Sequence, residues 1–372
     1  MIGSSTLQKL KNIGITVEYG ENALFPEFAA RHAGQSILLI ADRNTRRYAE
    51  ALRLSHTQLC LIDQDEPVPD EEVCSLVLRQ AENCDYLLAV GSGTLNDTAK
   101  YAALCTGKQS GVFATAPSMD GYASPVAAIM RGGFKVSEAA HVPSDILIDP
   151  AVLAAAPSEM IAAGAGDILG KYTCLTDWRL AEYHQGENVN EEAFSDMLRA
   201  VRTVADSVDD IARRGTDGVE KLTDALVISG LAMAEAGNSR PASGAEHHIS
   251  HYLEMWFVAQ KKRVPLHGIK VGLGTLVSAF LYRALERDGV AFRGAEETYR
   301  AAKMIPPLNE LTQTLQRLGA PVRFSALGIS RELFRETLSR AHTVRPRFTV
   351  LSLLEELGLM QRYLPELEER FY

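Results

Sequence analysis

The feature that most restricts the fold of this chain is a series of short apolar runs, separated by helical stretches, in its first 150 residues. The runs occupy residues 36–41, 59–62, 85–90, 112–115 and 145–148. Runs of this length that are apolar throughout are typical of strands buried on both faces. A hairpin is expected at 126–130 and 134–136, around a Gly-Gly turn. The alternation predicts a mostly parallel sheet with helices on both sides.

Beyond Pro150 the sequence pattern changes from alternating strands and helices to helices alone. Helical periodicity runs through residues 191–211, 221–236, 247–259, 266–285 and 330–341. We therefore expect an α/β domain over residues 1–156, a variant of the Rossmann fold, and an all-α domain over residues 157–372.

Composition narrows the classes of partner. The 372 residues carry a net charge of −9, which argues against nucleic acid or an anionic membrane as the main partner. The five cysteines show no CxxC spacing, which fits a reducing compartment and no zinc knuckle. The first residues lack the apolar core of a signal peptide, and the longest apolar run, 271–282, is too short to span a bilayer. A cytoplasmic protein without membrane insertion is expected.

A glycine-rich loop follows the buried run 85–90. Gly91 and Gly93 flank Ser92 where a helix should begin, so backbone amides could approach a phosphate there. The third glycine of the usual fingerprint is replaced by Asn96, and a plain tight turn is an equal alternative. Asp42, at the end of run 36–41, could accept a ribose hydroxyl and favours NAD. The neighbouring arginines 43, 46 and 47 keep NADP open, or form a solvated helix start.

A second constellation lies in the helical half. Ser243 and Glu246 have capping-box spacing, so a helix should begin there and present His247 and His251 on one face. His267 opens another apolar helix, and Asp167 is expected in the first turn of a third. Imidazoles and a carboxylate from three helix starts would hold a divalent cation.

Simpler explanations exist for the same residues. The histidines could be a polar stripe, and Asp167 could complement a helix dipole. The zinc-protease pattern His-Glu-x-x-His is absent because His248 takes the place of the glutamate, which disfavours hydrolysis by a glutamate-activated water.

Taken together, residues 91–100, 115–124, 165–171, 239–251 and 267–272 resemble the sn-glycerol-1-phosphate dehydrogenases. This family belongs to the superfamily of iron-type alcohol dehydrogenases, glycerol dehydrogenase and 3-dehydroquinate synthase. The resemblance extends from about residue 37 to 349 and is closest to the bacterial branch that uses nickel or zinc. It implies the dehydroquinate synthase-like fold, NAD or NADP, one divalent metal ion (nickel or zinc, with iron possible) and a homodimer.

The resemblance also assigns roles to residues. The implied metal ligands are Asp167, His247 and His267. The implied substrate contacts are Asp120, His251 and Lys171, together with the ligand Asp167. The implied cofactor-binding residues are Gly91, Ser92, Gly93, Thr94, Leu95, Asp97, Thr115, Ala116, Ser118 and Ser124, to which we add Asp42.

The implied reaction is the reversible reduction of dihydroxyacetone phosphate to sn-glycerol 1-phosphate by NADH or NADPH, a step of phospholipid biosynthesis. The metal would polarise the ketone, and His251 would relay a proton or donate a hydrogen bond. Arg240, Lys171 and Lys270 are candidates for holding the substrate phosphate.

Four other functions are considered. A glycerol or other polyol dehydrogenase of the same superfamily is the nearest, and 3-dehydroquinate synthase is disfavoured because its ligand set usually has a glutamate in place of Asp167. A non-catalytic NAD-binding module would bind cofactor without turnover. An iron oxygenase with a two-His, one-carboxylate site leaves Gly91–Gly93 and residues 115–124 unexplained.

Overall fold

A six-stranded parallel sheet forms the core of the first part of the chain in the computed structural model, which describes residues 1–64, 66–132 and 134–372. The strand order is β1-β8-β5-β4-β2-β3. The strands are β1 (Thr16–Tyr19), β2 (Ile37–Asp42), β3 (Thr57–Ile62), β4 (Tyr86–Gly91), β5 (Gln109–Ala114) and β8 (Asp145–Ile148). The parallel sheet predicted from the apolar runs is confirmed.

Burial explains which strands were visible in the sequence. Every residue of β2, β4 and β8 is buried, as a sheet covered on both faces requires. The strand β1 was not predicted, because it lies at the sheet edge, pairs only with β8 and has a single buried residue, Glu18.

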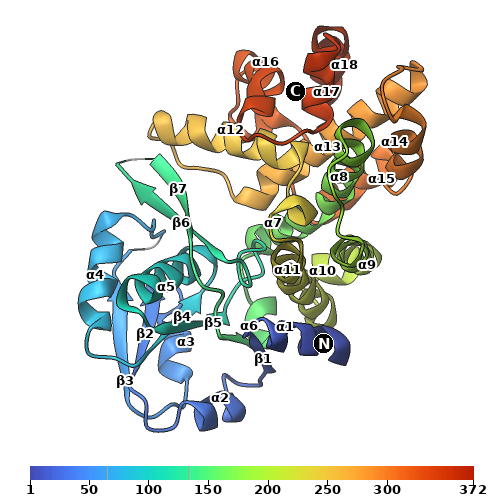
Figure 1. The fold of residues 1–372 in the computed structure, drawn as a ribbon. Coiled ribbons are helices and arrows are strands. Elements are labelled where there is room, and N and C mark those ends of the chain that lie inside the picture. The colour runs from blue at the N-terminus through green and yellow to red at the C-terminus, as the bar shows by residue number, and fades with distance from the viewer. Residues whose placement is uncertain (65, 133) are drawn as a thin grey trace.

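The predicted hairpin is also present. Strands β6 (Val126–Arg131) and β7 (Phe134–Ala139) pair antiparallel, with Val126 opposite Ala139. Gly133, the second glycine of the predicted turn, lies outside the described residues. The hairpin rises from the sheet towards helix α12 (Figure 1).

Helices cover both faces of the sheet. Helices α2 and α3 pack on the face formed by Leu39, Leu88 and Phe113, whereas α4 and α5 pack on the opposite face. The helices of this part are α1 (Ser4–Asn12), α2 (Pro26–Arg31), α3 (Arg46–Ala51), α4 (Glu71–Ala81) and α5 (Gly93–Thr106).

The strand order creates a switch point beside β4. From β2 the chain moves outwards to β3, then returns to β4 on the other side of β2 and continues to β5 and β8. In open α/β sheets, ligands bind outside the carboxyl ends of the strands at such a point. Asp42, Gly91 and Ala114 end the three strands concerned, so this edge is the expected place for a dinucleotide.

The second part of the chain is helical (Figure 1). Its α-helices are α6 (Pro150–Ala154), α7 (Ser158–Leu169), α8 (Lys171–Gln185), α9 (Glu191–Asp206), α10 (Val208–Ala212), α11 (Thr216–Ala236), α12 (Ala245–Ala259), α13 (His267–Arg287), α14 (Ala295–Ala302), α15 (Leu308–Arg317), α16 (Arg331–Arg340), α17 (Val350–Glu356) and α18 (Met360–Phe371). Three short 3-10 helices complete it, η1 (Arg240–Ala242), η2 (Phe324–Leu327) and η3 (Ala341–Thr343).

Helix α13 runs through the middle of this bundle and packs against α7, α12 and α15. Over its 21 residues it is long and apolar enough to cross a membrane, although its central run 271–282 alone is not. However, 94% of its most apolar window is buried inside the protein, as in a core helix. The division into domains at residues 156 and 157 stays a prediction.

Candidate active site

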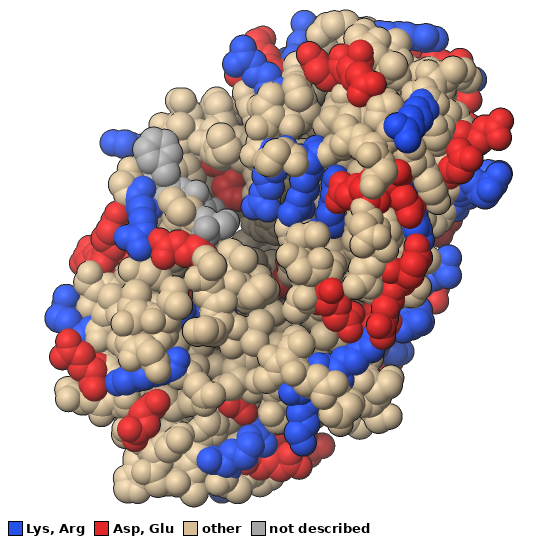
Figure 2. All heavy atoms as spheres, in the orientation of Figure 1, with Lys and Arg blue, Asp and Glu red and all other residues tan. Residues whose placement is uncertain are grey.

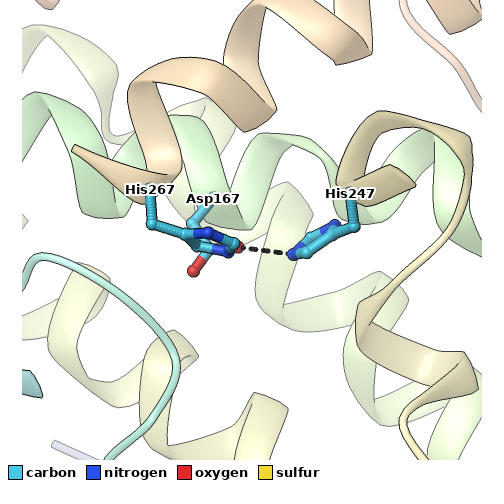
Figure 3. A group of neighbouring side chains, drawn as sticks. All are labelled: Asp167, His247 and His267. Carbon is cyan, nitrogen blue, oxygen red and sulfur yellow. Dashed lines mark ion pairs between the residues drawn. The ribbon is translucent and has the colours of Figure 1, made fainter. Parts of the chain in front are cut away.

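Three side chains from three helices converge on one point. Asp167 of α7, His247 of α12 and His267 of α13 each offer a ligand atom, and these atoms lie within 4.8 Å of one another. Figure 3 shows the three side chains pointing towards one another, with His247 Nε2 3.3 Å from Asp167 Oδ1. Two imidazole nitrogens and one carboxylate oxygen with this spacing can hold a divalent cation and leave positions open for another ligand.

The close crossing of α7 and α13 brings two of these side chains together. A Cβ atom on Gly268 would lie 1.7 Å from the carbonyl oxygen of Ala163, and one on Gly166 would lie 2.5 Å from that of Gly268. Only glycine permits this backbone approach. Because Gly166 precedes Asp167 and Gly268 follows His267, the crossing sets the distance between the carboxylate and the imidazole.

The position of Asp167 differs from the prediction. It lies in the last turn of α7, which ends at Leu169, and not in the first turn of a helix. The chain continues through Gly170 into α8, where Lys171 is the first residue. Gly170 itself has helical backbone angles, so the glycine-rich stretch is part of a helical path and does not precede a helix.

The start of α12 also differs from the prediction. Gly244 is the N-cap, and the buried Ser243 hydroxyl has no hydrogen-bond partner among the described residues, so the predicted capping box does not form. Glu246 Oε1 accepts from the Gly244 amide at 2.7 Å, and Asp177 Oδ2 accepts from the Ala245 amide at 2.6 Å. Two carboxylates thus satisfy the amides at this helix end.

Glu246 orients the metal-ligand candidate beside it. Its Oε1 lies 2.8 Å from His247 Nδ1, which leaves Nε2 facing Asp167. The same carboxylate accepts from Thr173 Oγ1 at 2.8 Å. A carboxylate on the second ring nitrogen is the usual support of a metal-binding histidine. Burial disfavours the charged form of His247, but Asp167 and Glu246 outweigh it and raise the pKa of the imidazole.

A buried lysine holds the carboxylate of Asp167. Lys171 Nζ lies 2.8 Å from Asp167 Oδ1, 2.8 Å from Asp120 Oδ2 and 3.0 Å from the carbonyl oxygen of Ala242. Burial opposes ionisation of Asp167, but the charge of Lys171 and the hydrogen bond with His247 outweigh it and keep the pKa of Asp167 well below its usual value. Asp167 is therefore a carboxylate, the form that binds a metal.

The other histidines of the sequence motif occupy different environments. The His251 ring lies 5.5 Å from that of His267 and 6.1 Å from that of His247, and its side chain is 22% exposed. Burial lowers the pKa of His251 to about 4 and that of His267 well below its ordinary value, so both are neutral at pH 7. His248 is fully buried and does not belong to the group of three ligand candidates, and neither of its ring nitrogens has a hydrogen-bond partner in the described parts of the chain.

The expected cofactor loops line the switch point of the sheet. Gly91 ends β4, Ser92 caps α5 and Gly93 begins it, followed by Thr94, Leu95 and Asp97. Thr115 donates its amide to the carbonyl oxygen of Gly91 at 3.1 Å, so the loop with Ala116, Ser118 and Ser124 lies beside the glycine loop. The Asp97 carboxylate pairs with Lys100 at 2.8 Å and accepts from the Ala128 amide, which ties the hairpin to α5.

Residues 115–124 connect this edge to the three ligand candidates. The sulfur of Met119 lies 3.1 Å from where a Cβ atom on Gly93 would be. The next residue, Asp120, donates its amide to Asp167 Oδ2 at 3.1 Å, and its carboxylate accepts from Lys171 Nζ and Ser229 Oγ. One short loop therefore spans from the glycine turn to the candidate metal ligand.

Asp42 ends β2 at the same edge. Its Oδ1 accepts from the Thr45 amide at 2.8 Å and from the Thr45 hydroxyl at 2.9 Å, which closes a tight turn and fixes the carboxylate. The nearby Arg43 pairs with Asp63 and Arg46 with Glu50.

The three basic residues considered for a substrate phosphate are all engaged. Lys171 is held by the two carboxylates described above, and Lys270 Nζ lies 3.4 Å from Glu254 Oε2. Arg240 forms a two-pronged ion pair with Glu187 and donates to the carbonyl oxygen of Phe348 at 2.9 Å. Each of the three therefore already has a carboxylate partner within the protein.

Sequence reasoning missed Glu246 as the support of His247, although it lies next to His247 within the quoted motif. Because it was assigned to a capping box, its second contact was not considered. It also gave no role to Arg345 or Arg347, which lie far along the chain in a segment without periodicity.

The comparisons with known proteins agree with this geometry. Residues 17–157 match the family model described as iron-containing alcohol dehydrogenase. The chain is 34% identical over 363 residues to glycerol-1-phosphate dehydrogenase (NAD(P)+) of Bacillus licheniformis, covering 93% of this chain and 90% of that protein. It is 36% identical over 267 residues to the enzyme of the same name from Pyrococcus furiosus, covering 72% and 70%.

Solved structures share the fold. The crystal structure of a probable glycerol dehydrogenase from Sinorhizobium meliloti superposes with a TM-score of 0.68 at 20% identity, covering 94% of this chain and 96% of that one. An alcohol dehydrogenase from Oenococcus oeni superposes with a TM-score of 0.70 at 16% identity, covering 95% and 98%. The predicted fold class and the resemblance stated from the sequence are both confirmed. The chain belongs to the family of glycerol-1-phosphate dehydrogenases (NAD(P)+), within the fold of the iron-containing alcohol dehydrogenases.

Proposed function

We propose that the protein is a metal-dependent oxidoreductase that interconverts dihydroxyacetone phosphate and sn-glycerol 1-phosphate with NADH or NADPH. The observation that carries the proposal is the loop of residues 115–124, in which the adjacent residues Met119 and Asp120 lie against Gly93 and Asp167. A hydride donor at the switch point and a ketone at the three ligand candidates would then be neighbours, as hydride transfer requires.

The donor set fits a divalent ion. Asp167, His247 and His267 would hold it, with Glu246 fixing the tautomer of His247 and Lys171 fixing Asp167. When bound, the ion supplies a Lewis acid for the ketone oxygen. Nickel, zinc and iron all accept two imidazoles and a carboxylate, so the donor set does not choose among them.

The remaining residues position the reactants. His251 would hydrogen-bond the substrate beside His247 and His267, and relay a proton at its imidazole. Asp120 and Lys171 would contact the substrate, as the resemblance implies, and both also hold Asp167 in place. Gly91–Gly93 would approach the pyrophosphate, and Asp42 would accept a ribose hydroxyl, which favours NAD.

Free glycerol is a less favoured substrate. The relatives at 32–37% identity are named for glycerol 1-phosphate, whereas the glycerol dehydrogenase structures are 19–20% identical and share only the fold. We further propose that the protein acts in the cytoplasm as a homodimer, with the glycine loop in an α/β domain over 1–156 and the metal ligands in a helical domain over 157–372.

A spectrophotometric assay of NADH and NADPH oxidation tests the proposal. The purified protein is stripped with a chelator, and nickel, zinc or iron is added back before dihydroxyacetone phosphate or dihydroxyacetone is supplied. We expect oxidation with the phosphorylated ketone only after one of the metals is restored. Equal turnover of both ketones would favour a polyol dehydrogenase, and cofactor binding without any turnover would favour a non-catalytic module.

A further inference from the structure

Two arginines beside the candidate active site lack a carboxylate partner. Arg345 and Arg347 lie between η3 and α17, and both are half-buried. Within residues 1–64, 66–132 and 134–372, no aspartate or glutamate oxygen lies within 4.0 Å of either guanidinium. This contrasts with Arg240, which is more deeply buried and paired with Glu187. Partly buried cations without a counter-charge are costly, so such a pair calls for an anion from outside the chain.

Burial has a measurable effect on both groups. It lowers the pKa of Arg345, and burial together with the charges of Arg345 and Arg240 outweighs the opposite charge of Glu187 and lowers the pKa of Arg347 to about 10. Both remain cations at pH 7. Two like charges that repel each other in a partly dry site would be relieved by an anion between them.

The contacts of Arg347 place the pair beside the start of α12. Its guanidinium donates to the carbonyl oxygen of Ser243 at 3.3 Å and to the hydroxyl of Ser239. Ser243 is 5% exposed, and its own hydroxyl has no hydrogen-bond partner in the part of the chain that the structure describes. A buried hydroxyl without a partner next to two cations is a second, independent sign of a ligand.

The same segment adjoins the candidate metal ligands. The carbonyl oxygen of Ala242, one residue before Ser243, accepts from the Lys171 ammonium that holds Asp167. His247 follows Ser243 by four residues and lies in the first turn of α12, which begins at Ala245. Figure 2 shows Lys and Arg side chains gathered beside a hollow between the sheet part and the helical part of the molecule.

Arg240 explains how the segment is held in place. Arg240 forms an ion pair with Glu187. Its guanidinium also donates to the carbonyl oxygen of Phe348, the residue directly after Arg347. The amide of Val350, two residues further on, donates to Asp177 Oδ1, and the other oxygen of that carboxylate accepts from Ala245 at the start of α12. The arginine segment and the ligand-bearing helix therefore share their anchors.

We propose that Arg345 and Arg347, with the Ser243 hydroxyl, bind the phosphate of the substrate and so select the phosphorylated ketone over the free one. This inference rests on the function proposed above. Guanidinium groups suit a phosphate dianion because they offer parallel donors, and a hydroxyl can donate one more bond. Because Ser243 lies only four residues before His247, the anion site adjoins the candidate metal ligands, as a three-carbon compound with a phosphate on one end and a reacting oxygen on its middle carbon requires.

The test compares Arg345→Gln and Arg347→Gln with Arg340→Gln in the metal-loaded enzyme. Arg340 is a matched control because its side chain is 69% exposed on α16 and lies 3.8 Å from Glu336. We expect each of the first two variants to lower kcat/KM for dihydroxyacetone phosphate by about 10- to 100-fold, the effect of one charge-assisted hydrogen bond. Neither metal content nor kcat/KM for dihydroxyacetone should change, and Arg340→Gln should match the wild type.

Inorganic phosphate provides a readout that does not depend on turnover. Titrated into the metal-loaded enzyme with NAD present, it should bind the wild type and Arg340→Gln in competition with dihydroxyacetone phosphate, and bind both proposed variants at least about 10-fold more weakly. Arg347 also donates to Ser243, so the Arg347→Gln variant could fail to fold. In that case Arg345→Gln alone decides the test, and Arg345→Lys is expected to recover part of the affinity for phosphate.

Two outcomes separate the inference from the proposed function. Suppose that the wild type reduces dihydroxyacetone phosphate. If Arg345→Gln reduces it equally well, or loses activity towards both ketones to the same extent, the proposed phosphate site is wrong while the proposed function stands. If the wild type reduces neither ketone with any metal, the proposed function itself fails.

Discussion

Replacing Gly268 by alanine should disturb the candidate metal centre without touching a ligand. Gly268 directly follows His267 on α13, and its Cα lies against the backbone of α7. The added Cβ atom would lie 1.7 Å from the Ala163 carbonyl oxygen and 2.5 Å from its carbonyl carbon. Both obstacles are backbone atoms, so no side-chain rotation can relieve the overlap.

The size of the disturbance follows from these distances. Cβ atoms essentially never approach a heavy atom closer than 3.0 Å, so α13 must move away from α7 by 3.0 minus 1.7, or about 1.3 Å. Overpacking of this kind costs about 1–3 kcal/mol of stability. Metal–ligand distances tolerate only about 0.2 Å, so a movement several times larger separates His267 from Asp167 and should remove most of the bound metal.

Gly272→Ala is the matched control. It lies one turn further along α13, and its Cβ atom would lie 3.3 Å from a methyl carbon of Leu315, which can move. Both substitutions replace a glycine of α13 by alanine, which gains at most about 1 kcal/mol of helix propensity, so a large difference between them in the opposite direction reports the backbone overlap. The assay measures the urea unfolding midpoint of each metal-free protein and the metal retained after dialysis. The prediction is refuted if Gly268→Ala has the same metal content and the same unfolding midpoint as Gly272→Ala.

Two further predictions concern charges at and away from the candidate site. Glu246→Gln should weaken metal binding about 10- to 100-fold, because His247 Nδ1 loses its carboxylate partner. A chelator competition measures the affinity, with the exposed Glu50→Gln as the control. The prediction is contradicted if this variant binds the metal as tightly as the wild type and the control do. In the sheet, His32 Nε2 lies 3.1 Å from Asp145; burial opposes its charge, but the hydrogen bond to Asp145 outweighs it and raises the pKa of His32 above 6.5. The stability that the charged form of His32 contributes is therefore complete below pH 6.5 and is lost as the pH rises through the raised pKa. Urea unfolding should show a larger stability difference between the wild type and His32→Gln at pH 5.5 than at pH 9. A difference that is independent of pH would contradict this prediction.

Strands with continuous apolar runs were predictable because they are buried on both faces. The run 85–90 becomes β4, every residue of which is buried. Strand β1 has no continuous apolar run, since its one buried residue is Glu18. The Glu18 carboxylate accepts hydrogen bonds from the amides of Glu27 and Phe28. A carboxylate that is buried because another element supplies its hydrogen bonds cannot be recognised from the pattern of residues in its own strand.

The candidate site was predictable in its residues more than in its local geometry. Asp167, His247 and His267 were chosen from motifs, and the structure brings them together. The expected helix start at Asp167 was wrong because α7 and α8 are nearly continuous through Gly170. The expected cap at Ser243 was wrong because Asp177, 66 positions earlier, accepts from the first amide of α12. Both depend on packing between distant segments, which periodicity does not report.

The measurement that tests the central claim most directly is the metal content of the purified protein and of its His267→Ala and His248→Gln variants, determined together with their reduction of dihydroxyacetone phosphate. Three ligands from three helices predict close to one ion per chain in the wild type. His267→Ala should lose the ion and the activity together, whereas His248→Gln should keep the ion because His248 lies outside the ligand group. Full activity in a metal-free His267→Ala protein would contradict the account.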